Sequence, residues 1–258
     1  MLRRLFDKNA DRRVRGWRVA IAMAAMCACL ASGSACAQGR ELSIAANIGT
    51  AVEREAEVYN VKHKLLGVSA RVHDSMQEIN EDYAGWFEQA DTPISYPVAQ
   101  AEDNDLYMDH SFTLESSSAG CLFLDYRNGA FFRDANCVVY GHHMKDDSML
   151  ATLVGYKQQS YYDAHQTMNL YTPYGDYIVE VFSGVIVSGA HDFLEFNFDS
   201  EAAFDEYWQP FLDDSTFESD IVPQYGDRLI TLITCTYEFD NARYIVCGRL
   251  KPVEVLEK

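Results

Sequence analysis

The chain has 258 residues, of which 48% are hydrophobic and 23% are charged, so it can bury a core and is too apolar to be a disordered protein. Its 39 acidic residues outnumber its 21 basic ones and give a net charge of −18. That balance argues against a protein that tracks nucleic-acid phosphates, and we expect no nucleic-acid partner.

A basic tail and an uncharged segment open the chain. Residues 1–18 hold seven basic and two acidic side chains, whereas residues 19–39 (VAIAMAAMCACLASGSACAQG) hold no charged one. A helix of that length can cross roughly 30 Å of hydrocarbon, and a basic flank stays cytoplasmic. We therefore expect a cytoplasmic tail at 1–18, a single transmembrane signal anchor at 19–39, and an extracellular domain held at the cell membrane.

Two other interpretations of this segment stay open. Ala35-Cys36-Ala37 fits the pattern of a cleaved secretion signal. A lipid-modified Cys36 is a weaker alternative, because the three residues before it lack the usual Leu. All three interpretations place the remaining domain outside the cytoplasm.

Residues 41–90 have a helical pattern, because long runs lack Gly and Pro and apolar side chains recur at helical spacing. The cleanest apolar stripe consists of Val68, Val72, Met76 and Ile79. We expect an N-terminal helical region at 40–75, followed by the main domain at 76–258.

After Trp86, short apolar runs alternate with Gly, Asp and Asn clusters, which predicts a β-barrel or a β-sandwich. The expected strands are ISYPVAQ, AGCLFLDYRN, CVVYGHH, DYIVEVFSGVIV, RLITLITCT and ARYIVCGRL. Two helical interruptions are expected, at 147–165 and 200–214. Pro210 should bend or end the second helix.

Four cysteines lie in the main domain: Cys121, Cys137, Cys235 and Cys247. Their spacing matches neither a zinc site nor a dense disulfide framework. We expect three of them to be small buried side chains, with a disulfide among those three left open, and one to be a reactive thiol.

The last two predicted strands bring a thiol and a guanidinium together. In a hairpin that is symmetric about Phe239, Cys235 lies directly opposite Arg243, with the two Cβ atoms roughly 5 Å apart on one face. A guanidinium in that position favours the thiolate and can hold a developing oxyanion. The prediction depends on register, because a slip of one residue sends Arg243 to the other face.

A proton donor is expected from His142 and His143, which follow the apolar strand that ends in Tyr140 and Gly141. Adjacent strand residues point to opposite faces, so only one of the two histidines can reach Cys235. A Cys–His pair supports acyl transfer, in which the imidazole delivers a proton to the leaving amine. No ligand set at familiar spacing completes a metal site here, and we expect neither a metal nor a cofactor.

Two strings carry a resemblance to a known family: YGHHMKDDSML (140–150) and TLITCTYEFDNAR (231–243). They resemble the two signatures of class B sortases, the membrane-anchored cysteine transpeptidases of Gram-positive bacteria. INEDYAGWF (79–87), TPISYPVAQAEDNDLYM (92–108) and GCLFLDYRN (120–128) also resemble family segments in the family's order. The likeness covers about residues 76–252.

The resemblance implies a mainly-β fold, a closed eight-stranded sortase-type barrel with N-terminal helices and a helix inserted before the cysteine strand. It implies that Cys235 is the nucleophile, His142 the general acid/base and Arg243 the residue that positions substrate and stabilises the oxyanion. The position after His142, often Asn in the family, is His143 here. A further set of residues is expected to line the substrate groove: Asn104, Met108, Phe193 and Leu194.

The implied reaction is cleavage of a C-terminal sorting motif after its Thr, through a thioacyl intermediate on Cys235. An amine of a cell-wall precursor or of a pilin then resolves the thioester and anchors the surface protein. Two alternatives stay open. One is a secreted cysteine protease, in which water is the acceptor. The other is a non-catalytic surface module, although the presence of Cys, His and Arg together speaks against it.

Overall fold

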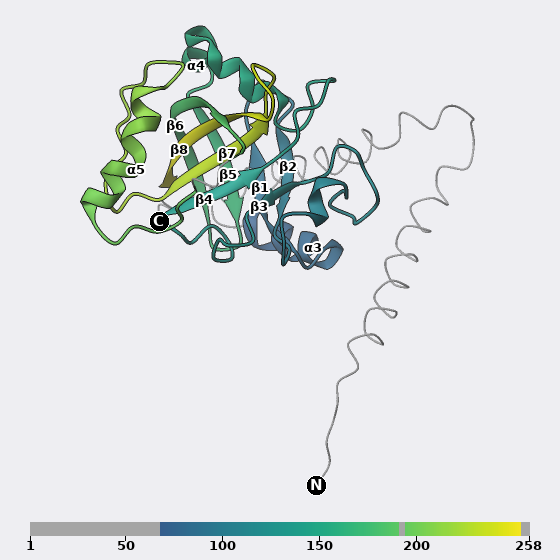
Figure 1. Cartoon of the computed structure of the whole chain (residues 1–258). Helices are drawn as coiled ribbons and strands as arrows, with labels where there is room; N and C mark the ends of the chain where they lie inside the picture. Colours follow the sequence, from purple (N-terminus) through teal and green to yellow (C-terminus); the bar gives the residue numbers. More distant parts are fainter. Residues whose placement is uncertain (1–67, 191–193, 254–258) are drawn as a thin grey trace. The chain divides into compact units, whose positions relative to one another are not determined.

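A computed structural model describes residues 68–190 and 194–253 of the chain, all within one compact unit (Figure 1). The predicted tail, signal anchor and most of the N-terminal helical region lie outside the described residues, and so does Phe193. No helix within the described ranges has both the length and the apolar character needed to cross a membrane. The boundary expected at residue 76 stays a prediction.

Helices and strands follow one another in an order dominated by strands. The elements are α3 (Val68–Ile79), β1 (Tyr83–Glu88), β2 (Ser95–Ala99), η1 (Leu106–Met108), β3 (Leu122–Leu124), β4 (Asn136–Tyr140), η2 (Ala151–Lys157), α4 (Gln159–Ala164), β5 (Thr167–Thr172), β6 (Gly175–Ser188), α5 (Glu201–Asp213), β7 (Leu229–Cys235) and β8 (Ala242–Pro252).

The eight strands form one closed barrel in the order β1-β2-β3-β4-β7-β8-β6-β5. The sheet closes where β1 pairs antiparallel with β5. Most pairs are antiparallel, but β2–β3 and β4–β7 are parallel. The helix α5 lies in the connection between β6 and β7, as Figure 1 shows. The predicted mainly-β closed barrel, with a helix before the cysteine strand, is therefore confirmed.

Alternation along the strands divides the core in two. On β7, Leu232 packs into the barrel interior with Tyr244 and Val246 of β8. Ile233 points the other way, into a second cluster that α5 covers with Trp208. Successive side chains of a strand face opposite sides of the sheet, so one strand can serve both clusters. By the same alternation, Cys235 and Arg243 lie on the face of the sheet that carries Ile233 and Ile245 of this outer cluster.

Three sequence predictions need correction. The helical pattern was expected to continue to residue 90, but 83–88 form β1, because this segment pairs with β2 and β5 and closes the barrel. The strand β5 was not expected at all. Pro210 does not end α5, which continues to Asp213 with the backbone N–H of Asp214 donating to the Pro210 carbonyl. Pro210 is exposed, so the carbonyl that its missing N–H leaves unpaired can bind water.

The apolar stripe predicted for α3 is only partly correct. Met76 is buried and Val72 packs beside it, but Ile79 is 43% exposed. The helix instead buries His73, whose Nδ1 bonds the hydroxyl of Tyr83. A polar side chain in that position is tolerated because the tyrosine at the start of β1 supplies a hydrogen-bond partner.

Candidate active site

The β7–β8 hairpin places the thiol of Cys235 and the guanidinium of Arg243 side by side. The antiparallel ladder pairs Cys235 directly with Arg243, so the predicted register is confirmed. Both side chains are half-buried. Arg243 donates from Nη1 to the carbonyl of Ala242 at 3.1 Å and forms no ion pair with a described carboxylate. Its remaining N–H groups are therefore available to a group that approaches the thiol.

A parallel ladder between β4 and β7 brings the histidine pair to the same end of the sheet. Tyr140 pairs with Ile233, and the backbone N–H of Gly141 donates to the Ile233 carbonyl at 3.1 Å. The chain therefore reaches His142 just as β7 reaches Cys235. Glycine is required at 141, because an added Cβ would lie 2.4 Å from Cδ2 of Leu122.

The two histidines make different contacts. His142 donates from Nε2 to the carbonyl of Met108 at 2.7 Å, and its Nδ1 edge is left for a second contact. His143 bonds the carbonyl of Cys235 through Nδ1 at 2.8 Å. The His143 ring also packs against that of Tyr237, with 5.2 Å between centroids. His143 thus holds the backbone that carries the thiol, whereas the His142 ring is held from the η1 segment.

The residues predicted to line a substrate groove have different surroundings. Met108 is 44% exposed at the end of η1, and its carbonyl holds His142. Leu194 packs on the outer cluster, which also contains Val187, the neighbour of Arg243 across β6–β8. Asn104 is half-buried and bonded at both ends of its amide. The structure thus brings Met108 close to His142 and Leu194 to the cluster beneath Arg243.

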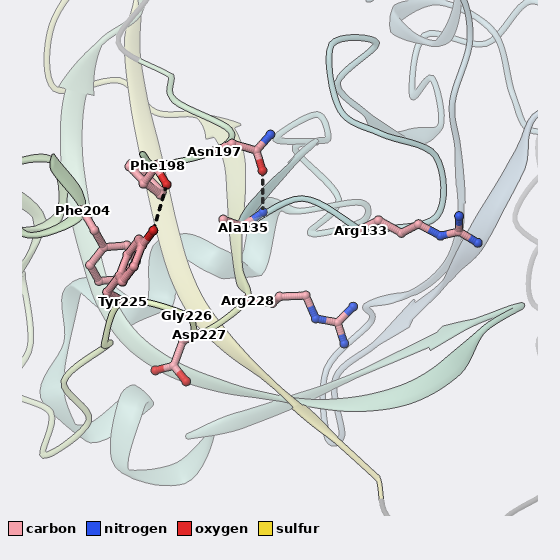
Figure 2. Close-up of a pocket in the computed structure, with 9 residues that line it drawn as sticks. All are labelled: Arg133, Ala135, Asn197, Phe198, Phe204, Tyr225, Gly226, Asp227 and Arg228. Atoms are coloured by element: carbon pink, nitrogen blue, oxygen red, sulfur yellow. Dashed lines mark hydrogen bonds between the residues drawn. The ribbon is translucent and has the colours of Figure 1, made fainter. Parts of the chain in front are cut away.

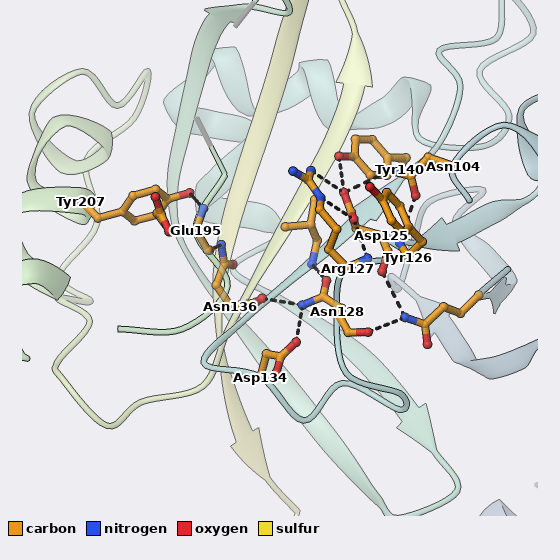
Figure 3. A network of polar contacts seen from close by, with 12 residues as sticks. Asn104, Asp125, Tyr126, Arg127, Asn128, Asp134, Asn136, Tyr140, Glu195 and Tyr207 are labelled. Atoms are coloured by element: carbon orange, nitrogen blue, oxygen red, sulfur yellow. Dashed lines mark hydrogen bonds and ion pairs between the residues drawn. The ribbon is translucent and has the colours of Figure 1, made fainter. Parts of the chain in front are cut away.

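A buried carboxylate that the sequence analysis missed lies in a polar network at the end of β4 (Figure 3). Asp125 is fully buried and accepts hydrogen bonds from Asn104, Tyr140 and, in bidentate fashion, Arg127. Burial raises the pKa of Asp125, but these donors outweigh it and hold the pKa below its ordinary value. Because Tyr140 precedes Gly141 and His142, the ionised carboxylate anchors the strand end that carries the imidazole. Nothing in the sequence spacing marks Asp125 for this task.

A second unpredicted contact secures the loop after Cys235. Lys157, the last residue of η2, donates to Oγ1 of Thr236 at 2.6 Å and pairs with Glu238. Hydrogen bonds from Lys157 and Thr236 lower the pKa of Glu238 to about 2. The ammonium also lies over the ring of Tyr244, 5.1 Å from its centroid. We call these residues, Lys157, Thr236 and Glu238, the lysine latch.

The other described cysteines are unsuited to catalysis. Cys121, Cys137 and Cys247 are buried and unpaired, and burial raises the pKa of each thiol, in Cys137 to about 12. Cys235, by contrast, is partly exposed. Its access to solvent and its pairing with Arg243 distinguish Cys235 from the other described cysteines. In the part of the chain that the structure describes, no three His, Cys, Asp or Glu side chains group as metal ligands.

Two sortase B proteins are similar to this chain in sequence. No family model matches the chain. A sortase B from Listeria monocytogenes is 34% identical over 206 residues, which cover 78% of this chain and 84% of that protein. A sortase B from Staphylococcus aureus is 31% identical over 183 residues, covering 69% and 73% of the two chains.

Solved structures agree with these sequence matches. The Staphylococcus aureus sortase B–substrate complex superposes with a TM-score of 0.76 at 25% identity and covers 84% of this chain and 99% of that one. The Clostridium perfringens sortase B structure has a TM-score of 0.66 at 32% identity, covering 69% and 99%. The similarity therefore extends over nearly the whole of both solved chains.

Proposed function

This chain belongs to the sortase B family of cysteine transpeptidases, and from that premise we propose that Cys235, His142 and Arg243 are its catalytic residues. The observation that carries the proposal is the direct pairing of Cys235 with Arg243 on the β7–β8 hairpin. It is supported by the β4–β7 ladder, because His142 follows the end of β4 at the same end of the sheet where β7 ends at Cys235.

The proposed first step is acylation of the enzyme. The Sγ thiolate of Cys235 attacks the carbonyl carbon of the Thr in a C-terminal sorting motif, and the carbonyl becomes an oxyanion. The guanidinium of Arg243 donates to that oxyanion. When the C–N bond breaks, His142, as the imidazolium, gives the proton on Nδ1 to the departing amine and becomes neutral, and a thioester with Cys235 remains.

The proposed second step transfers the acyl group. An incoming amine attacks the thioester carbonyl, His142 accepts a proton from it, and the Cys235 thiolate leaves as the new amide forms. Proton and electron pair balance over the two steps, so no cofactor takes part. The acceptor is an amine of a cell-wall precursor or of a pilin.

The substrate and the cellular setting follow from the same proposal. The partners are surface proteins that end in a sorting motif, held by Asn104, Met108, Phe193 and Leu194. The enzyme works at the cell surface, as a single-pass membrane protein whose residues 19–39 form the anchor and whose N-terminus is cytoplasmic. The uncharged 21-residue segment after a basic tail supports this arrangement.

A two-arm assay tests the proposal. The protein is incubated with peptides that contain candidate sorting motifs, with and without an added amine, and the products are followed by mass spectrometry. We expect an amide product that appears only with the amine, and a thioester adduct on Cys235 in its absence. The Cys235→Ala variant should form neither. Peptide cleavage that is indifferent to the amine would instead identify a protease, and an unreactive Cys235 would identify a non-catalytic module.

A further inference from the structure

Two donors share the carbonyl of Ala242 at the start of β8. This oxygen accepts from Nη1 of Arg243 and from the backbone N–H of Thr236, each at 3.1 Å. A carbonyl oxygen has two lone pairs, so both of its acceptor positions are filled. Ala242 is 1% exposed, so water has little access to replace either donor. The guanidinium beside Cys235 is thus held by a carbonyl that the residue after Cys235 also binds.

The Ala242 carbonyl is the one polar partner of the Arg243 side chain in the described part of the chain. No carboxylate there pairs with the guanidinium, and no aromatic ring there stacks on it. A donor to an oxyanion has to be held within about 0.5 Å of its productive position. A shift of this carbonyl would therefore misplace the guanidinium, and the groups that fix the carbonyl matter for the reaction.

The lysine latch fixes Thr236 through its side chain. Oγ1 of Thr236 accepts from Nζ of Lys157 at 2.6 Å and donates to Oε2 of Glu238 at 2.7 Å. Thr236 is 5% exposed, and hydrogen bonds to ionised groups are stronger than those between neutral groups. Two charged side chains therefore hold the residue whose backbone N–H donates to Ala242.

Lys157 also holds the residue on the other side of Arg243. Its ammonium lies 5.1 Å from the ring centroid of Tyr244, which follows Arg243 on β8. The hydroxyl of Tyr244 bonds Oγ1 of Thr216 at 2.7 Å. Tyr244 faces the barrel interior, whereas its neighbour on the strand faces the opposite side with Cys235. The contact of Lys157 with Tyr244 therefore fixes β8 from the barrel side.

We propose that Thr236 and Lys157 are positioning residues for Arg243. By fixing the Ala242 carbonyl, they orient the guanidinium toward the oxyanion that forms at Cys235. This positioning role rests on the proposed function, in which Arg243 is the oxyanion donor. Neither residue touches the substrate, so the loss of either should slow acylation only while the guanidinium is present.

A double-mutant cycle on single-turnover acylation tests this role, with the peptide that the two-arm assay identifies. Thr236→Val keeps the shape of the side chain but removes its hydroxyl. It should slow acylation about tenfold, since the net value of one hydrogen bond corresponds to about that factor. Thr236→Ser restores the hydroxyl and should come within about threefold of the wild type. In an Arg243→Ala background, Thr236→Val should change the rate by less than about twofold.

Two substitutions on and beside β7 are the matched controls. Thr231→Val removes a buried hydroxyl that donates to Oδ1 of Asn136 at 2.8 Å. It should lower the thermal midpoint as Thr236→Val does, but it should leave the acylation rate unchanged. Arg228→Ala removes a guanidinium just before β7, at the other end of the strand from Cys235, where Arg228 lines the pocket in Figure 2. In that background Thr236→Val should keep its effect of about tenfold.

Lys157→Met reaches the same carbonyl through the latch and replaces Thr236→Val if that variant fails to fold. Its effect should likewise disappear in Arg243→Ala. A wild type that is not acylated, or an Arg243→Ala variant that is acylated at the wild-type rate, would overturn the proposed function together with this role. If Arg243→Ala is impaired but Thr236→Val or Lys157→Met keeps its full effect in that background, the positioning role alone is overturned. An equal loss of rate in Thr231→Val would also overturn it.

Discussion

The pairing of Cys235 with Arg243 puts a planar, permanently charged donor beside the thiol. An ammonium on a flexible stem cannot present two parallel N–H groups to an oxyanion as a guanidinium does. We therefore predict that Arg243→Lys lowers kcat/KM for peptide transfer about 10²–10³-fold, by analogy with the loss of one oxyanion donor. Steady-state kinetics with a sorting-motif peptide measures the effect.

Arg249→Lys is the matched control on the same strand. Arg249 lies six residues further along β8 and pairs with Glu180. Its substitution should change kcat/KM less than twofold. An equal loss in both variants would mean that Arg243 acts through the stability of β8 and not at the reacting carbonyl.

The contacts of the two histidines predict different defects on substitution. Replacing His142 by Ala removes the proposed proton donor and should lower kcat by about 10²–10⁴-fold. Replacing His143 by Ala removes a hydrogen bond to the carbonyl of Cys235. It should lower kcat by about tenfold, because the backbone at the thiol is less constrained. Single-turnover acylation, followed by mass spectrometry, compares the two variants. A larger loss in His143→Ala than in His142→Ala would assign the general acid to His143.

At the scale of elements, the lysine latch joins η2 to the connection between β7 and β8. Lys157→Met keeps the side-chain length but removes both polar contacts. We predict a loss in kcat of about threefold to tenfold with little change in the thermal midpoint, because the loop after Cys235 is loosened while the barrel is intact. Lys251→Met, which removes an ammonium at the other end of the barrel, should leave kcat unchanged.

The docking of α3 on the barrel carries two groups with opposing pH dependence. Burial lowers the pKa of His73 to about 4 and raises the pKa of Asp176, near Tyr83, to about 6. Between pH 6.5 and 4 the unfolded chain protonates His73 and the native chain does not, so His73 lowers the free energy of unfolding as the pH falls. As the pH falls, Asp176 takes up a proton at a higher pH in the native chain than in the unfolded chain. It therefore raises the free energy of unfolding over nearly the same pH range.

The two effects largely cancel in the wild type, and single substitutions should separate them. Asp176→Asn removes the stabilisation that protonation of Asp176 gives at low pH. The free energy of unfolding of this variant should therefore fall more steeply than that of the wild type from pH 6.5 to 4. His73→Gln should show the opposite slope. Urea denaturation at several pH values measures both, and parallel curves for all three proteins would contradict the assignment.

For the molecule as a whole, α5 supplies a large part of the outer core. Trp208 is 1% exposed and packs against Phe182, Phe204 and Phe211. We predict that Trp208→Ala lowers the free energy of unfolding by about 3–5 kcal/mol, since the surrounding strands cannot collapse into the cavity. Gln209→Ala, on the exposed side of the same helix, should lower the free energy of unfolding by no more than about 0.5 kcal/mol. Urea denaturation distinguishes the two.

Much of this molecule could be predicted from local pattern. Alternating apolar residues located six of the eight strands, and the hairpin signal after Thr236 fixed the pairing of Cys235 with Arg243. The strands β1 and β5 were missed because each forms only as the closing edge of the barrel finds its partner. Their pairing joins residues more than 80 positions apart, as with Trp86 and Tyr171, and no local window contains that information.

The sequence by itself determined the strand-rich class and the pairing of Cys235 with Arg243, because these depend on contacts within a few residues. Only the tertiary structure decided which groups surround them. Asp125, which holds the end of the strand before His142, and Lys157, which holds the loop after Cys235, both come from distant segments. Barrel closure brings such groups together, and the entropy of closing those long loops is offset by the core as a whole, not by any motif.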